Sequence, residues 1–61
     1  MERVMLAEKV SFKTRAVKLG GNWLDAPPDL DLKEVRIGKT YRFNLAQKLD
    51  GTWYIVELIK D

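Results

Sequence analysis

Two strand-like runs near the C-terminal end of the chain are separated only by Asp50-Gly51. The runs extend from Lys39 to Leu49 and from Thr52 to Lys60. Asp-Gly between such runs is the strongest local signal for a β-hairpin, because a type I′ turn requires positive φ at both central residues. The sequence therefore predicts a hairpin with Asp50 and Gly51 in its turn.

A two-residue loop fixes the register of this hairpin, pairing Leu49 with Thr52 and Phe43 with Leu58. In that register one face is apolar and forms a core, with Tyr41, Phe43, Leu45, Tyr54, Val56 and Leu58. The other face carries Arg42, Asn44, Ala46, Lys48, Trp53, Ile55, Glu57 and Ile59. A three-residue loop with a G1 bulge at Gly51 is the alternative, and it shifts the pairing by one residue. We prefer the two-residue loop because it keeps the apolar side chains together.

Residues 9–16 alternate strictly between apolar or small and polar side chains, which predicts a half-buried strand. Its outward row is Lys9, Ser11, Lys13 and Arg15. Val4 and Leu6 continue the apolar parity, with a bend or bulge expected at Ala7-Glu8, although a short helical turn over residues 2–8 is an alternative. The predicted core combines Val10, Phe12, Phe43, Leu45, Val56 and Leu58.

The middle of the chain contains turn and capping signals. Gly20-Gly21-Asn22 predicts a turn into a short return strand, Trp23-Leu24-Asp25, which the proline pair at 27–28 ends. Asp31 to Glu34 has the spacing of a capping box, and Gly38 stands where a helix C′ glycine would. We expect one or two helical turns over residues 31–37, with a strand over residues 29–37 as the alternative.

Sixty-one residues allow one small domain, 1–61. Successive strands, short turns and at most one short helical turn near residues 31–37 predict an all-β fold class, a small five-stranded curled sheet or barrel.

Residues 35–43, the Asp50-Gly51 hairpin and Trp53-Tyr54-Ile55-Val56 resemble the closing strands of small OB-fold or SH3-like nucleic-acid-binding barrels. In those families a short helical or irregular crossover ends at Gly-Lys or Gly-Asp before the last two strands. The resemblance covers roughly residues 35–60 and implies a nucleic-acid-binding barrel. It leaves an SH3-like and a minimal OB-like topology equally open, since the aromatic motifs of cold-shock domains are absent.

The composition excludes several classes of chemistry. The chain has no cysteine and no histidine, which removes disulfides, thiolate zinc sites and the commonest general base. No apolar run reaches the length of a membrane helix and no signal peptide is recognised, so we expect no membrane association and a cytoplasmic location. The acidic residues Asp25, Asp29, Asp31 and Glu34 lack the spacing of a calcium loop. We therefore expect a protein that is not an enzyme and has no cofactor or metal.

Charge is unevenly distributed although the formal net charge is only +2. Residues 9–24 carry four cations and no acid, and residues 35–49 carry four more. Cations along one face neutralise phosphates, and flat aromatic rings stack on bases. The sequence thus predicts a nucleic-acid-binding face, with single-stranded DNA or RNA favoured over duplex, formed by Lys9, Lys13, Arg15, Trp23, Arg42, Lys48 and Trp53.

Three alternatives remain at this point. The basic row can be a solvated sheet face that discourages edge-to-edge aggregation. The tryptophans can be core residues, as is usual in small domains. The chain can also be a protein-interaction module, an accessory subunit or a homo-oligomer, in which the tryptophan face meets an apolar partner surface.

Overall fold

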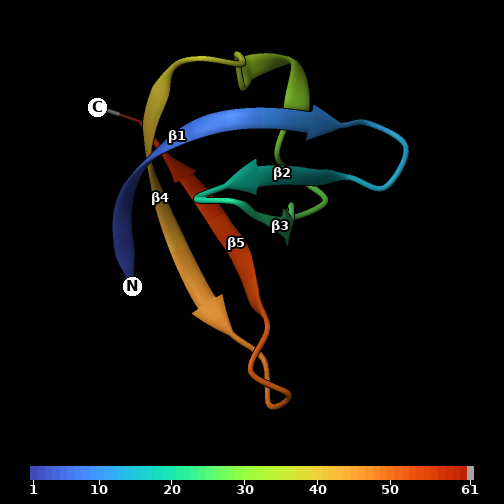
Figure 1. The fold of residues 1–61 in the computed structure, drawn as a ribbon, viewed down its shortest axis with the longest axis vertical. Coiled ribbons are helices and arrows are strands. Elements are labelled where there is room, and N and C mark those ends of the chain that lie inside the picture. The colour runs from blue at the N-terminus through green and yellow to red at the C-terminus, as the bar shows by residue number, and fades with distance from the viewer. Residues whose placement is uncertain (61) are drawn as a thin grey trace.

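The strands of the computed structural model, which describes residues 1–60, close into a small barrel in the order β1-β2-β3-β5-β4, with β1 pairing back to β4 (Figure 1). Neighbouring strands are antiparallel, except that β3 and β5 run parallel. The elements are β1 (Glu2–Ser11), β2 (Ala16–Leu19), β3 (Asn22–Asp25), the 3-10 helix η1 (Leu32–Glu34), β4 (Thr40–Gln47) and β5 (Trp53–Ile59). The predicted fold class, a five-stranded all-β barrel with one short helical turn, is confirmed.

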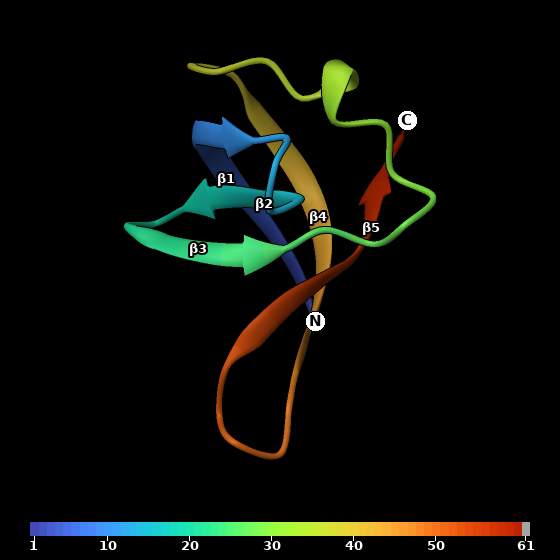
Figure 2. The same cartoon turned by 90° about the vertical axis from the view of Figure 1, so that its right-hand side faces the viewer.

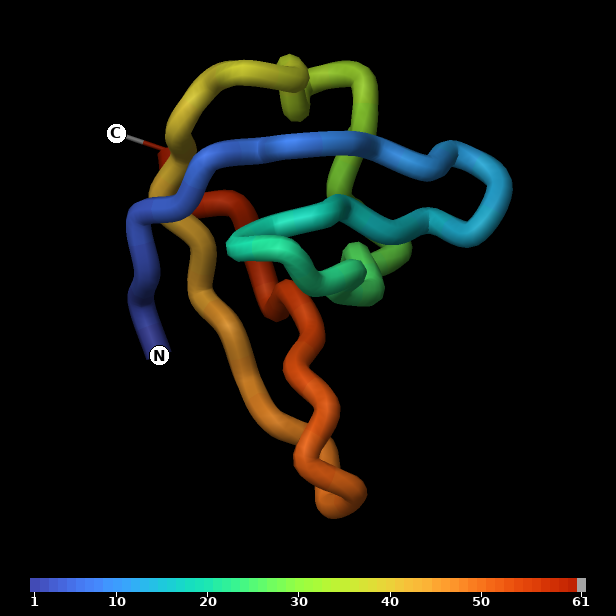
Figure 3. The backbone as a smooth tube through the Cα atoms, in the orientation of Figure 1, coloured from blue at the N-terminus to red at the C-terminus, as the bar shows by residue number. Residues whose placement is uncertain are grey.

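β1 is strongly curved, and its two halves pair with different neighbours (Figure 3). The first half pairs with β4 and the second with β2, and the register shifts directly after Ala7. The bulge expected at Ala7-Glu8 is therefore confirmed, and a helical turn over residues 2–8 is wrong. Because an extra residue reverses side-chain parity, Ala7 is buried while Val4 and Leu6 point to solvent, contrary to the prediction.

β1 ends at Ser11, and residues 12–15 turn the chain into β2, so the continuous strand predicted over residues 9–16 is wrong. The Ser11 hydroxyl accepts hydrogen bonds from the Thr14 backbone N–H and the Thr14 hydroxyl, at 3.3 and 2.8 Å. Phe12 therefore lies in this turn, 61% exposed, rather than in the predicted core. The alternating pattern could not reveal the turn, because it describes polarity and not the direction of the backbone.

The β4–β5 hairpin has a three-residue loop, so the predicted two-residue turn is wrong and the alternative with a G1 bulge is confirmed. Gln47 pairs with Trp53, and beyond them the Lys48 N–H donates to the Thr52 carbonyl at 2.7 Å. The Gly51 N–H donates to the Lys48 carbonyl at 2.9 Å, which closes the turn. Gly51 has a φ of 92°, the left-handed conformation that a G1 bulge requires.

A second irregularity, at Val56 of β5 opposite Asn44 and Leu45 of β4, restores the predicted register farther from the loop. Phe43 pairs with Leu58 as predicted, whereas Leu45 pairs with Ile55 rather than with Val56. Ile55 is consequently 1% exposed, and Val56, which we predicted to be in the core, is 40% exposed. The pattern could not place this irregularity, because β5 is apolar at nearly every position and tolerates either parity.

The turn between β2 and β3 is as predicted. Gly20 and Gly21 have φ values of 57° and 82°, and they connect the paired residues Leu19 and Asn22. Positive φ at both central residues is the requirement of a type I′ hairpin turn, which glycine meets without steric cost. The return strand ends at Asp25, before the proline pair, as expected.

The crossover between β3 and β4 is helical for only three residues. Asp31 is the N-cap, and its carboxylate accepts a hydrogen bond from the Lys33 N–H at 3.0 Å. Glu34 does not return to the N-cap; its carboxylate pairs with Lys60 at 3.0 Å instead. Gly38 is not the C′ residue, because η1 has already ended and Gly38 lies in a following turn with a φ of 90°.

The core lies inside the barrel, and the crossover covers one end of it (Figures 1 and 2). The largest fully buried side chains are Phe43, Leu19, Leu32, Ile55 and Val17. Leu45 is buried as predicted, and Val10 and Leu58 are partly buried against this core. Leu30, Leu32 and Val35 of the crossover are buried in the same cluster, whereas within residues 1–60 no comparable segment covers the other end of the barrel.

Candidate nucleic-acid interface

A row of three side chains crosses the outer surface of β1, β2 and β3. Lys9 pairs with Lys18, and Lys18 pairs with Trp23 on the next strand. Val17 and Leu24, which flank these positions, are buried, so the row faces away from the core. Lys9 and Trp23 were both predicted for the site, and the structure places them on one surface with Lys18 between them.

The uncovered end of the barrel contains a cleft of about 500 Å³. Three separate parts of the chain line it: the start of β1, the β2–β3 hairpin and the β4–β5 hairpin. Both tryptophans belong to the lining, and Trp23 is 50% exposed and Trp53 38% exposed. Among the described residues that line this cleft, Arg3 is the only one with a charged side chain, and Asn22 and Thr52 add polar side chains. We refer to this feature as the tryptophan cleft.

The cleft exists because β3 and β5 diverge. They pair only at Asp25 and Tyr54, and Figure 2 shows the two strands separating from there toward the β2–β3 turn and the β4–β5 loop. Leu24 and Trp53, which directly precede the paired residues, already line the cleft. Both tryptophans therefore stand beside this gap in the ladder, and Trp23 is exposed in addition because it points outward in the row with Lys18.

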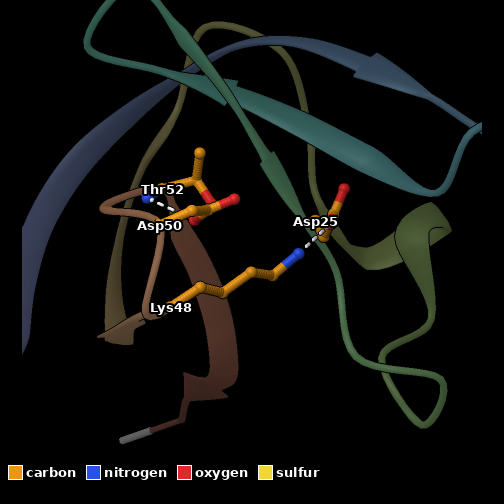
Figure 4. A network of polar contacts seen from close by, with 4 residues as sticks. All are labelled: Asp25, Lys48, Asp50 and Thr52. Atoms are coloured by element: carbon orange, nitrogen blue, oxygen red, sulfur yellow. Dashed lines mark hydrogen bonds and ion pairs between the residues drawn. The ribbon is translucent and has the colours of Figure 1, made fainter.

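The β4–β5 loop contributes a cation beside the cleft. The Lys48 ammonium pairs with the Asp25 carboxylate at 3.1 Å and lies 5.9 Å from the centre of the Tyr54 ring. Figure 4 shows this lysine extending from the loop toward the end of β3. The loop itself is held by Asp50, whose carboxylate accepts hydrogen bonds from the backbone N–H and the hydroxyl of Thr52, at 3.0 and 2.7 Å. These bonds, the backbone one above all, lower the pKa of Asp50 below its ordinary value.

Arg15 connects two segments of the backbone through its side chain. Its Nη2 donates to the carbonyls of Pro27 and Leu30, each at 2.7 Å, and so ties the β1–β2 turn to the crossover. The residue has a φ of 52°, which is uncommon for a residue other than glycine. The hydrogen bonds of the side chain supply a reason for this backbone conformation.

The other predicted residues are distributed around the barrel. Lys13 is exposed in the turn of residues 12–15. Arg42 lies on the outer surface of β4 between Val4 and Ile59, and lines a second hollow of about 480 Å³ that shares no lining residue with the tryptophan cleft. The structure thus groups Lys9 with Trp23, and Trp23 with Trp53, and it separates Arg42 from them.

Two residues near this group were not predicted. Lys18 lies within the basic segment 9–24, but the strand we expected ended at residue 16, so no face could be assigned to it. Arg3 reaches the cleft only because the barrel closes β1 on β4, and no local pattern carries that information.

Within residues 1–60, no group of three or more acidic side chains is arranged to hold a metal ion, and no helix is long and apolar enough to span a bilayer. Comparisons with protein-family models, with curated proteins and with solved structures find no match to this chain.

Proposed function

We propose that this protein binds single-stranded nucleic acid with low sequence specificity and that its barrel is of the OB type. The observation that carries the proposal is the convergence of Trp23 and Trp53 on one cleft, beside a surface row with two lysines. The two indoles come from strands that are far apart in the sequence, and both are accessible.

The topology supports the OB assignment over the SH3-like one. β1, β2 and β3 follow one another through tight turns, and β4 returns by the long crossover to pair with β1, which is a Greek-key order. OB folds are five-stranded, partly open Greek-key barrels that bind through the face of strands 2 and 3 and through the loops after strands 1 and 4. The candidate residues lie in these places: Lys18 and Trp23 on the face, Lys13 and Lys48 in the loops.

The chemistry supports single strands. Each base stacked on an aromatic side chain contributes about 1–3 kcal/mol, and bases of a duplex are not available for this contact. The cleft volume of about 500 Å³ lies within the roughly 300–1,000 Å³ typical of ligand sites. In this proposal Lys9, Lys13 and Lys18 contact phosphates while the two indoles stack on bases, and none of these contacts selects a sequence.

The test is a titration of tryptophan fluorescence with an oligothymidine of about 16 nucleotides, the upper site size of one OB fold, at several salt concentrations. The unmodified protein should bind at low salt, with a log–log slope of about −0.7 per phosphate neutralised. Lys9→Ala and Lys18→Ala should each flatten the slope by about 0.7, whereas Lys33→Ala, on η1 at the covered end of the barrel, should leave it unchanged.

The tryptophan variants separate stacking from charge. Trp23→Ala and Trp53→Ala should each weaken binding by about 1–3 kcal/mol without changing the slope, because stacking releases no counterions. Anisotropy of a labelled oligonucleotide replaces fluorescence for these two variants. If neither DNA nor RNA single strands bind at low salt, the proposal is wrong.

A protein-interaction module is the second candidate, and a different surface supports it. Val4 and Leu6 are 65% and 46% exposed on the outer face of β1, beside the hollow that Arg42 lines. Exposed apolar groups of this kind favour contact with another protein. Such an interface requires no oligonucleotide, so the absence of binding in the titration at low salt would favour this second function.

A further inference from the structure

The Lys48–Asp25 ion pair lies on the outer surface, where β3 and β5 meet. Asp25 and Tyr54 are paired in the parallel register, and their neighbours Leu24 and Ile55 are buried, so both face outward. Lys48 reaches them from the β4–β5 loop, and its ammonium lies near the Tyr54 ring and 3.1 Å from the Asp25 carboxylate. The three side chains together cover the only point at which the two strands pair.

We propose that the Asp25 carboxylate occupies the place of a phosphate, and that a bound strand displaces it to form an additional subsite from Lys48 and Tyr54. This inference rests on the proposed binding of single-stranded nucleic acid. In the bound state Lys48 contacts a phosphate oxygen and the face of Tyr54 becomes available to a base.

The exchange is chemically conservative, because one anionic oxygen ligand of the ammonium replaces another. The side chains of Lys48 and Asp25 are 48% and 65% exposed, so solvent screens their attraction and the pair is easily opened. A phosphate contact also releases counterions from the nucleic acid, which the internal pair does not. The equilibrium therefore favours displacement when a strand is present at low salt.

Tyr54 lies next to the tryptophan cleft along β5, on the other side of the strand. Trp53, the preceding residue, lines the cleft, and successive side chains of a strand point to opposite sides. A strand that leaves the cleft over the edge of β5 thus meets the indole first and the phenol next. Asp25 is the only carboxylate described in contact with Lys48. After the bound strand has displaced this carboxylate from Lys48, its negative charge faces the phosphate that replaces it.

The test uses the oligothymidine titration with variants of this pair. Asp25→Asn should strengthen binding by up to about five-fold, the equivalent of one exposed ion pair. Lys48→Ala should flatten the salt slope by about 0.7, and the gain from Asp25→Asn should vanish when Lys48→Ala is also present. Tyr54→Leu should weaken binding without changing the slope.

Glu34→Gln is the matched control, because it also removes one acid from an exposed ion pair, with Lys60, and changes the net charge equally. If Glu34→Gln strengthens binding as much as Asp25→Asn, or if Lys48→Ala leaves the slope unchanged, the subsite is wrong while the proposed function stands. If the unmodified protein binds no single strand, both proposals are wrong. Thermal melts of the variants in the absence of nucleic acid exclude loss of folding as the cause.

Discussion

The two phenylalanines provide the sharpest test of how this chain is packed. The alternating sequence pattern places both Phe12 and Phe43 in the core, whereas the structure leaves Phe12 61% exposed and buries Phe43 completely. The same substitution, to alanine, should therefore have very different effects at the two positions. The pair is matched in chemistry and differs only in environment.

The expected magnitudes follow from burial. A fully buried aromatic side chain removes about 150–250 Å² from water, which at about 25 cal/mol per Å² corresponds to roughly 4–6 kcal/mol. Alanine retains part of this area, and measured Phe→Ala losses in cores are about 3–5 kcal/mol. The tilted contact between the rings of Phe43 and Tyr41, with centroids 6.0 Å apart, is also lost. Phe12→Ala, in an exposed turn, should change stability by no more than about 0.5 kcal/mol.

The assay is urea unfolding followed by tryptophan fluorescence and circular dichroism. A domain of this length has a total stability of roughly 3–9 kcal/mol, so Phe43→Ala is expected to remove between about a third and all of it. Ile55→Val gives a measurable companion, with an expected loss of about 0.5–1.5 kcal/mol, and Val56→Ala should cost less because Val56 is 40% exposed. A larger loss for Phe12→Ala than for Phe43→Ala, or for Val56→Ala than for Ile55→Val, would refute this packing.

Three further predictions concern the turns. Gly51→Val should destabilise the domain by more than about 1–2 kcal/mol in urea unfolding, since a β-branched residue is poorly suited to a φ of 92°. Gly51→Asn should cost less stability, and equal losses for the two variants would count against the G1 bulge. Arg15→Ala should lower stability by at least about 1.5 kcal/mol, because its charged side chain donates to two carbonyls of the crossover, and an unchanged urea midpoint would contradict this task. Asp50 has a lowered pKa in the folded protein, so its contribution is complete above the unfolded pKa of about 3.9 and is lost as pH falls through the folded pKa. The urea midpoint should therefore fall less steeply with acidification in Asp50→Asn than in the unmodified protein. If the urea midpoint depends on pH identically in the two proteins, Asp50 does not contribute to the loss of stability in acid.

Features that depend on a few neighbouring residues could be predicted without knowledge of the fold. Gly20-Gly21 specified a turn with positive φ at both residues, and the proline pair ended β3. Asp31 specified the N-cap of η1. The location of the final hairpin and the all-β class followed from the spacing of such signals along the chain. Each of these rests on backbone sterics or on a hydrogen bond that spans two or three residues.

Which strand faces are buried could be established only from the packed barrel. Register shifts in β1 and between β4 and β5 reversed the parity, so Val4, Leu6 and Val56 face outward and Ile55 faces inward. Such a shift depends on how a strand fits two different neighbours, and an alternating pattern records only its own side chains. Arg15 shows the same limit, because its positive φ accompanies hydrogen bonds to carbonyls beyond β3.

The candidate site likewise has features that could be predicted from the sequence and features that depend on the fold. The sequence identified the residue types, cations and two tryptophans, but it could not establish whether the indoles are buried or exposed. Their shared cleft arises because β3 and β5 pair at a single point and then diverge, leaving one end of the barrel open. Barrel closure brings Arg3, Trp23 and Trp53 together from three parts of the chain, and this proximity is a property of the whole sheet that no local segment encodes.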